Sequence, residues 1–185
     1  MFIAIIGLLL PCWMRGQNLK NDRIKQIEIK QHRKYLVGKC IQAYTQACSL
    51  IDTTTNEVSA ASMERFKDLF LQNAKVWNDI SETPTLISTS DYVGAAYIYL
   101  KNEGINTRFL NEYNFLKGEY AMKSDSTEKP RYYQKVQLEK ILYNGLDQKK
   151  RLKNYRKGRK FYLEFDIYVN DDEKRAFIMN IRSLP

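Results

Sequence analysis

Histidine and cysteine are scarce in this chain, and their scarcity excludes several kinds of site. The 185 residues include one His, His32, and three Cys. A structural zinc site needs about four Cys or His ligands, so no metal site is predicted. A Ser-His-acid or Cys-His catalytic arrangement would have to use His32. That residue lies within the polar run 30–34 and is therefore predicted to be solvated.

Glycine is also sparse, and it is scattered. The chain has eight Gly, of which Gly38, Gly94 and Gly104 are isolated from one another. A phosphate-binding loop needs several glycines at fixed short spacings, because the backbone must approach the phosphates closely. The sequence therefore predicts no nucleotide site and no cofactor. No internal repeat is visible.

The one long apolar run is Met1–Met14, which carries no charge. It is too short to span a bilayer, which takes about 20 residues. We interpret residues 1–16 as a secretory signal peptide cleaved near Gly16, followed by a single domain over residues 17–185. The protein is then exported, to a periplasm or to the extracellular space. Because no Lys or Arg follows Met1, a membrane anchor or a mis-assigned start stays open as an alternative.

The three cysteines carry separate expectations. Pro11 precedes Cys12 where a lipid-attachment signal has Gly or Ala, which disfavours a lipid anchor at Cys12. Cys40 and Cys48 are predicted to share a helix, where eight residues separate their Cα atoms by about 12 Å. A disulfide needs Cα atoms within about 7 Å. Both are therefore predicted to be buried free thiols.

The most informative stretch runs from Ser59 to Ile80. Ser59 or Ser62 can cap a helix whose apolar residues, Met63, Phe66, Leu69 and Phe70, recur at spacings of three and four. The pattern breaks at residues 72–73 and is followed by alternation over 76–80. The sequence thus predicts a short helix, then a short strand ending near Ile80.

The remaining elements are predicted from periodicity. A first helix is predicted over Asp22–Asp52, with the apolar stripe Val37, Ile41, Tyr44, Cys48 and Ile51. A third helix begins in the cluster 88–91 and ends at Gly104. Four strands follow: 105–115, with a bend at Gly118; 132–143, with a phase shift near Ile141; 161–169; and 177–181, with Phe177, Met179 and Ile181 on one face. Residues 124–130 are predicted to form a hairpin loop, and residues 170–172 a turn.

The pattern F-x-x-L-F-x-x-N-A-x-V-x-N-D, residues 66–79, resembles the nuclear transport factor two-like (cystatin-like, SnoaL-like) superfamily. The resemblance covers roughly residues 24–183. It implies an α+β fold in which three N-terminal helices pack on a curved, mostly antiparallel, cone-like sheet. Such a fold hosts both enzymes and non-catalytic binding modules, so it leaves activity open.

The resemblance also suggests where a site would lie. Enzymes of the superfamily place an acid or base and a Tyr inside the cone. Here Asp79 is the candidate base, because an apolar wall could raise its pKa into a useful range. The other candidates for the pocket are Trp77, Tyr92, Tyr97, Tyr113 and Asp166. The alternative is that Asp79 faces water at a strand end and the aromatic residues belong to the core.

A strongly basic segment covers residues 149–160. It holds eight basic residues and no acid, against a net charge of +9 for the whole chain. These are Lys149, Lys150, Arg151, Lys153, Arg156, Lys157, Arg159 and Lys160. Self-repulsion predicts a solvated loop, which is either merely solubilising or a contact for an anionic surface. Export and the presence of a single aromatic residue, Tyr155, disfavour nucleic acid as the partner.

Three hypotheses for function follow. The first is an exported, non-catalytic binding or interaction module, with a small ligand or a protein partner, including a homodimer through the sheet face. The second is a small isomerase, dehydratase or hydrolase that uses Asp79. The third is a peripheral protein that binds anionic surfaces through residues 149–160.

Overall fold

A computed structural model describes residues 10–48, 51–52, 57–80, 85–103, 105–109, 113–122, 131–144 and 159–184. Gly104, the predicted loop 124–130 and most of the basic segment lie outside this part of the chain. The chain forms two compact units, residues 1–35 and residues 36–185, and each is described by itself. Among the described residues, no helix is long and apolar enough to cross a membrane.

The first helix, α1 (Leu10–Ala47), contributes residues to both units. It begins twelve residues before the predicted Asp22 and ends five before the predicted Asp52. It ends early because the following residues enter a small ribbon, in which β1 (Ile51–Asp52) pairs with β2 (Glu57–Val58). Ile51 is therefore a strand residue, and its predicted place in the helical stripe is wrong.

The part of α1 in the larger unit carries the predicted apolar stripe. Val37, Ile41, Tyr44 and Cys48 are all buried, which confirms the spacing argument. Cys40 and Cys48 are both buried thiols that form no disulfide with each other, as predicted. Burial raises the pKa of the Cys40 thiol to about 12, and the nearby charge of Arg175 only partly offsets that effect.

The stretch after α1 forms a helix and a strand, but their boundaries differ from the prediction. Helix α2 (Ala60–Lys67) is capped by Ser59, whose hydroxyl accepts a hydrogen bond from the Ser62 backbone N–H at 3.1 Å. Strand β3 (Phe70–Trp77) begins six residues before the predicted start and stops before Ile80. Residues 72–73, where the sequence indicates a break, lie inside it, in the stretch between Phe70 and Lys75 where its pairing with a neighbouring strand shifts register.

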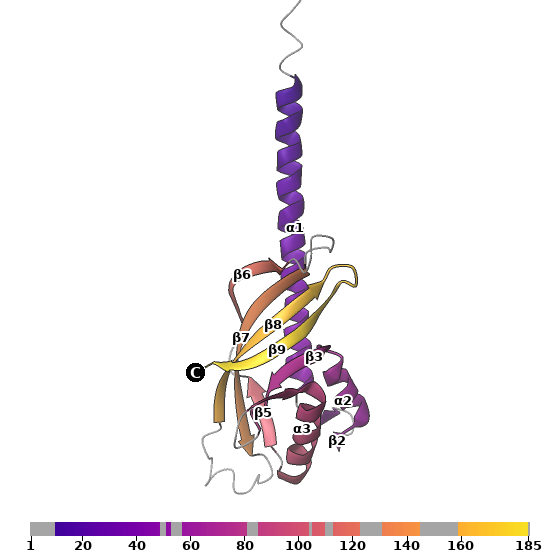
Figure 1. The fold of residues 1–185 in the computed structure, drawn as a ribbon, viewed down its shortest axis with the longest axis vertical. Coiled ribbons are helices and arrows are strands. Elements are labelled where there is room, and N and C mark those ends of the chain that lie inside the picture. Colours follow the sequence, from indigo (N-terminus) through magenta and orange to yellow (C-terminus); the bar gives the residue numbers. More distant parts are fainter. Residues whose placement is uncertain are drawn as a thin grey trace, which may run out of the picture. The chain divides into compact units, whose positions relative to one another are not determined.

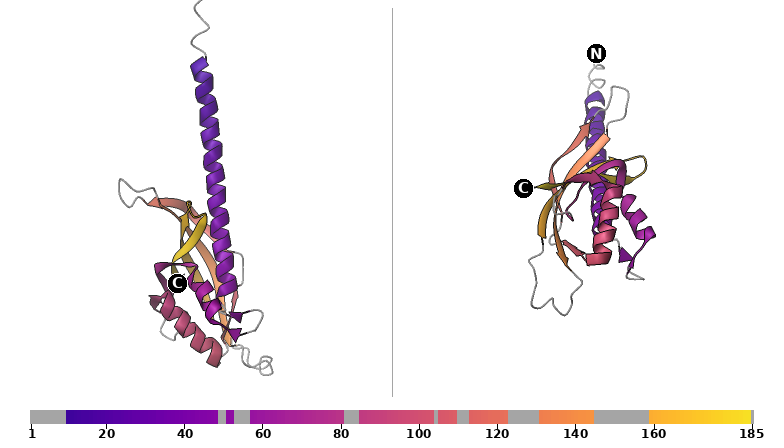
Figure 2. Two further views of the ribbon diagram at one scale, coloured as in Figure 1. Left: turned by 90° about the vertical axis from the view of Figure 1, so that its right-hand side faces the viewer. Right: turned by 60° about the horizontal axis from the view of Figure 1, so that its bottom comes forward.

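Helix α3 (Thr89–Glu103) begins inside the predicted cluster 88–91. The Ser88 hydroxyl accepts a hydrogen bond from the Asp91 backbone N–H at 3.1 Å, so it caps the first turn. The preceding residues form β4 (Leu86–Ser88), a strand that the sequence did not indicate. Helices α2 and α3 lie side by side in every view (Figures 1 and 2).

The main sheet has seven strands in the order β4-β3-β9-β8-β7-β5, with β6 also paired to β7. Its remaining strands are β5 (Ile105–Phe109), β6 (Asn114–Met122), β7 (Arg131–Asn144), β8 (Arg159–Asn170) and β9 (Arg175–Leu184). All pairs are antiparallel except β3 with β9. The long strands β7, β8 and β9 are visibly curved (Figure 1).

The predicted strand 105–115 is in fact two strands, β5 and β6, both of which pair with β7. Beyond them, the predicted irregularity at Gly118 is confirmed. The pairing of β6 with β7 shifts register between Phe115 and Glu119, where four residues of β6 advance against two of β7.

Two other predictions about strand phase were wrong. No phase shift occurs near Ile141, because β7 and β8 pair in unbroken register from Tyr132 to Leu142. In β9 a register shift near Met179 changes which residues face inward. Ala176, Ile178 and Ile181 are the buried residues there, and Phe177 and Met179 are only partly buried.

The core lies between the three helices and one face of the sheet. It combines residues of α1, α2 and α3 with inward residues of β3, β7, β8 and β9. The fold is therefore α+β, with three helices packed on a curved, mostly antiparallel sheet, as predicted. The opposite face of the sheet, called the outer face below, is defined by Lys135, Glu139, Glu164, Asp166 and Arg182.

Candidate functional site

Asp79 lies just beyond the end of β3, at a sharp change of chain direction. The Asn78 backbone N–H donates to the Thr85 carbonyl at 2.8 Å, and the Asp79 backbone N–H donates to the Trp77 carbonyl at 3.0 Å. The Asn78 side chain accepts a hydrogen bond from the Ile80 N–H at 3.3 Å, which closes a local turn. This turn directs the Asp79 side chain into the protein, where it is 0% exposed.

Two side chains from distant parts of the chain enclose the Asp79 carboxylate. The Tyr92 hydroxyl, from the first turn of α3, donates to Oδ1 at 3.0 Å. The Lys140 ammonium, from the inner face of β7, lies 2.7 Å from Oδ2. Its approach is off the direction of a hydrogen bond to Oδ2, so this contact is an ion pair. Lys140 Nζ also donates to the Tyr92 hydroxyl at 3.0 Å, which closes a triangle of three polar groups.

All three groups are shielded from water, and their charges depend on one another. Lys140 is 1% exposed and Tyr92 is 2% exposed. Burial acts to lower the pKa of Lys140, but the charge of Asp79, with smaller effects of Tyr44 and Tyr92, holds that pKa well above its usual range. Burial, aided by the Asp79 charge, raises the pKa of Tyr92. Lys140 is therefore an ammonium at neutral pH and Tyr92 a neutral phenol.

Tyr44 of α1 connects this polar triangle to the aromatic core. Burial raises its pKa, and Lys140 interacts with its hydroxyl. Its ring lies 5.0 Å from the ring of Phe165 and 5.8 Å from that of Phe66, centroid to centroid. Phe66 in turn stacks on Tyr92 at 5.8 Å with an interplanar angle of 19°. The interior around Asp79 is thus filled by rings in the arrangements that aromatic pairs prefer.

This arrangement restricts what Asp79 can do chemically. A general base must lie within hydrogen-bond reach of the proton that it removes. Here both carboxylate oxygens already contact groups of the same chain, and the carboxylate has no exposure. The geometry is that of a buried ion pair joining the end of β3, α3 and β7.

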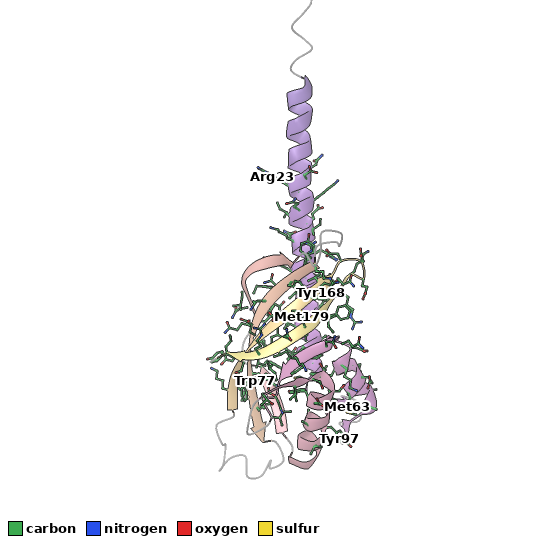
Figure 3. All side chains as sticks on the ribbon, viewed as in Figure 1. Arg23, Met63, Trp77, Tyr97, Tyr168 and Met179 are labelled. Carbon is green, nitrogen blue, oxygen red and sulfur yellow. The ribbon has the colours of Figure 1, made fainter. Side chains whose placement is uncertain are left out.

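The other candidates between the helices and the sheet do not converge on Asp79. Trp77 ends β3, is half-buried, and its indole Nε1 has no hydrogen-bond partner among the described residues (Figure 3). Tyr97 is half-buried on α3. Tyr113 precedes β6, and its ring packs edge-on against Phe115 at 5.5 Å. Of the six proposed pocket residues, Asp79 and Tyr92 are joined by a hydrogen bond.

Asp166 lies on the outer face, away from the helices. Its cross-strand neighbours in β7 and β9 are Lys135 and Asn180, whereas the adjacent Phe165 faces the core. Lys135 Nζ lies 3.6 Å from Asp166 Oδ1 and 2.6 Å from Glu164 Oε1. The Arg182 guanidinium contacts Asp166 Oδ2. These contacts form a network of opposite charges across three strands.

The basic segment is described only at its end. Residues 149–158 lie outside the described part of the chain, and Arg159 and Lys160 begin β8. Lys160 is exposed and pairs across the strands with Glu139. The third hypothesis therefore stays a prediction.

Sequence reasoning missed Lys140, although a signal was present. Val136, Leu138 and Leu142 are buried on the inner face of β7, and Lys140 occupies the inward position between the last two. Strict alternation would have placed it inside, and a buried Lys demands a carboxylate partner. The phase shift predicted near Ile141 hid this inward position and, with it, the ion pair.

Comparisons with known proteins give little further information. No family model matches the chain, and no curated protein matches it. Among solved structures, the chain aligns with a designed protein of the nuclear transport factor two-like fold, over 89% of this chain and 99% of the other, at 12% identity and a TM-score of 0.36. A likeness this loose carries no argument about function.

Proposed function

We propose that the chain is an exported, non-catalytic interaction module of the nuclear transport factor two-like class. One observation carries the non-catalytic part. The acid that the resemblance offers as a catalytic base is fully buried and contacts Lys140 and Tyr92 of its own chain. The class is supported by the order of the elements and by three helices packed on one curved sheet.

The rival hypothesis needs a reachable carboxylate. An isomerase, dehydratase or hydrolase using Asp79 would have to bring a substrate proton to an oxygen that Lys140 or Tyr92 now contacts. Opening the ion pair would leave a charge without its partner in a low-dielectric interior, which costs about 3–5 kcal/mol. A surface-acting module requires no such opening, because its interior has only to hold the fold together.

The test is chemical access to Asp79 in the native protein. The chain is treated with a water-soluble carbodiimide and glycine ethyl ester, and modification is followed at each carboxylate by peptide mass spectrometry. Asp91, exposed on α3, is the matched control. We expect Asp79 to react at least about 100-fold more slowly than Asp91, because it becomes accessible only through opening of the structure.

The same reaction in denaturant should bring the two aspartates to similar rates. This shows that the difference arises from the fold. Reaction of native Asp79 within about threefold of Asp91 would mean that small molecules enter the interior. That result would overturn the proposal and favour the enzyme hypothesis.

A further inference from the structure

The N-terminal unit presents a helical segment that is exposed on every side. Every residue of α1 from Asn21 to His32 is exposed. Three isoleucines are among them: Ile24 at 54%, Ile27 at 55% and Ile29 at 47% exposure. Exposed apolar side chains mark an interaction surface where they adjoin one another, and Ile24 and Ile27, three residues apart, are neighbours on the helix.

Basic residues are concentrated on one face of this segment. Lys20, Arg23, Ile27, Lys30 and Lys34 follow one another at spacings of three, four, three and four, which aligns them along the helix. The two acids of the segment lie off this line. At about 100° per residue, Glu28 is about 100° and Asp22 about 140° from Ile27. We call Arg23, Ile27, Lys30 and Lys34 the basic stripe.

The positive charges of the basic stripe and the isoleucines among them together indicate what kind of partner it binds. Its cations suit an anionic surface, and Ile24 and Ile27 lie among them where they can enter an apolar layer. Nucleic acid would match the charges but would gain little from the isoleucines. A membrane with anionic headgroups matches both.

We propose that the basic stripe of α1 binds an anionic lipid surface. Arg23, which projects from the helix in Figure 3, contacts headgroup phosphates together with Lys30 and Lys34, while Ile27 enters the headgroup–acyl boundary. This goes beyond the proposed function and does not depend on whether Asp79 is catalytic. It also does not require residues 149–160.

The experiment is vesicle co-sedimentation of the full chain. Vesicles of phosphatidylcholine alone are compared with vesicles containing about one third phosphatidylglycerol. Binding to the first is the charge-independent baseline, and the gain on the second reports electrostatic docking. We expect that gain to fall steeply between 50 mM and 500 mM NaCl, because screening shortens the reach of surface charge to a few ångströms.

Two pairs of variants locate the effect. The triple variant Arg23→Gln, Lys30→Gln, Lys34→Gln should lose on the order of 100-fold in the phosphatidylglycerol-dependent affinity. Its charge-matched control is Lys25→Gln, Lys75→Gln, Lys174→Gln, at exposed sites off the stripe, and should lose less than about fivefold. Ile27→Ser should weaken binding several-fold, and Ile29→Ser, about 160° away on the helix, should not.

The possible outcomes separate the alternatives. Equal losses of affinity in the two triple variants would show that binding depends on the total charge of the chain. An unchanged affinity in the stripe variant would assign binding to another part of the chain. Tighter, Ile27-independent binding to duplex DNA than to vesicles would identify nucleic acid as the partner. Each result overturns the proposal. Because these side chains are exposed, unchanged thermal unfolding should confirm that every variant folds.

Discussion

At the scale of single residues, the pair Asp79–Lys140 is the feature that most distinguishes this core. A Lys whose pKa is raised on folding stabilises the protein at every pH below its unfolded value of about 10.4. That contribution is lost only as the pH rises through the higher folded pKa. The lysine side of the pair therefore makes no pH-dependent contribution to stability in the neutral range.

Replacing one partner of this pair should lower the free energy of unfolding more than replacing both. Lys140→Met leaves the Asp79 carboxylate buried without its cation, so we expect a loss of about 3–5 kcal/mol in the free energy of unfolding. Asp79→Leu leaves Lys140 stranded in the same way. The double variant has no buried charge here and should be less destabilised than either single variant. Urea denaturation of the four proteins measures the coupling.

The exposed pair Glu64–Lys67, with its N–O distance of 2.9 Å, is the control for that cycle. Solvent screening limits such a pair to less than about 1 kcal/mol, so Lys67→Met should change stability little. A double variant at Asp79 and Lys140 as unstable as the sum of its singles would contradict the interpretation of the ion pair.

At the scale of the elements, two helical glycines occupy opposite environments. A Cβ on Gly94 of α3 would meet nothing within 4 Å, whereas one on Gly38 of α1 would lie 2.6 Å from the Tyr113 hydroxyl oxygen. Ala is favoured over Gly inside a helix by about 1 kcal/mol. Gly94→Ala should therefore stabilise the protein by about that amount, and Gly38→Ala should fail to do so or should destabilise it.

A second substitution tests the cause of that difference. With Tyr113→Phe the hydroxyl is gone, and the nearest remaining contact to the new Cβ is the ring carbon Cζ at 3.6 Å. Gly38→Ala should then stabilise the Tyr113→Phe protein by about as much as Gly94→Ala stabilises the parent. Thermal unfolding of these variants measures it. Equal gains at both glycines in the parent chain would show that Tyr113 does not restrict Gly38.

The elements also show how far sequence patterns reach. Helix α3 and strand β8 were predicted well, because each has a strong local signal: the cluster before Asp91 and the alternation from Phe161 to Val169. The early start of β3 was not predicted, and neither was the change near Met179 in which residues of β9 face the core. Both depend on pairing with strands far away in the sequence, and periodicity within one segment carries no information about that.

The candidate site was predicted in part, for a related reason. Asp79 and Tyr92 were both named, but as parts of a possible pocket. The contact that defines their environment comes from Lys140, 48 residues after Tyr92 in the chain. Asp166 was grouped with them on the resemblance alone, although the alternation from Phe161 to Val169 already places it on the face of β8 opposite Phe165, which points into the core.

At the scale of the whole molecule, α1 is one helix in two different environments. Its residues 36–47 include the buried residues Val37, Ile41 and Tyr44 of the apolar stripe. Its residues 21–32 are all exposed. An isolated helix in water is only marginally stable, because its first turn is costly to form and no packed face supports it. Continuous helical geometry therefore does not imply uniform stability.

Hydrogen exchange should reveal this difference along α1. We expect backbone amides of residues 23–31 to exchange within about 100-fold of the rate for an unstructured chain. Amides of residues 41–47 should exchange only when the protein unfolds globally. A free energy of unfolding on the order of 5 kcal/mol or more slows their exchange by a factor of at least several thousand. Ile41→Ala should lower protection only in the second group. Equal protection of both groups would show that residues 23–31 are packed in solution, as they would be against a second copy of the helix.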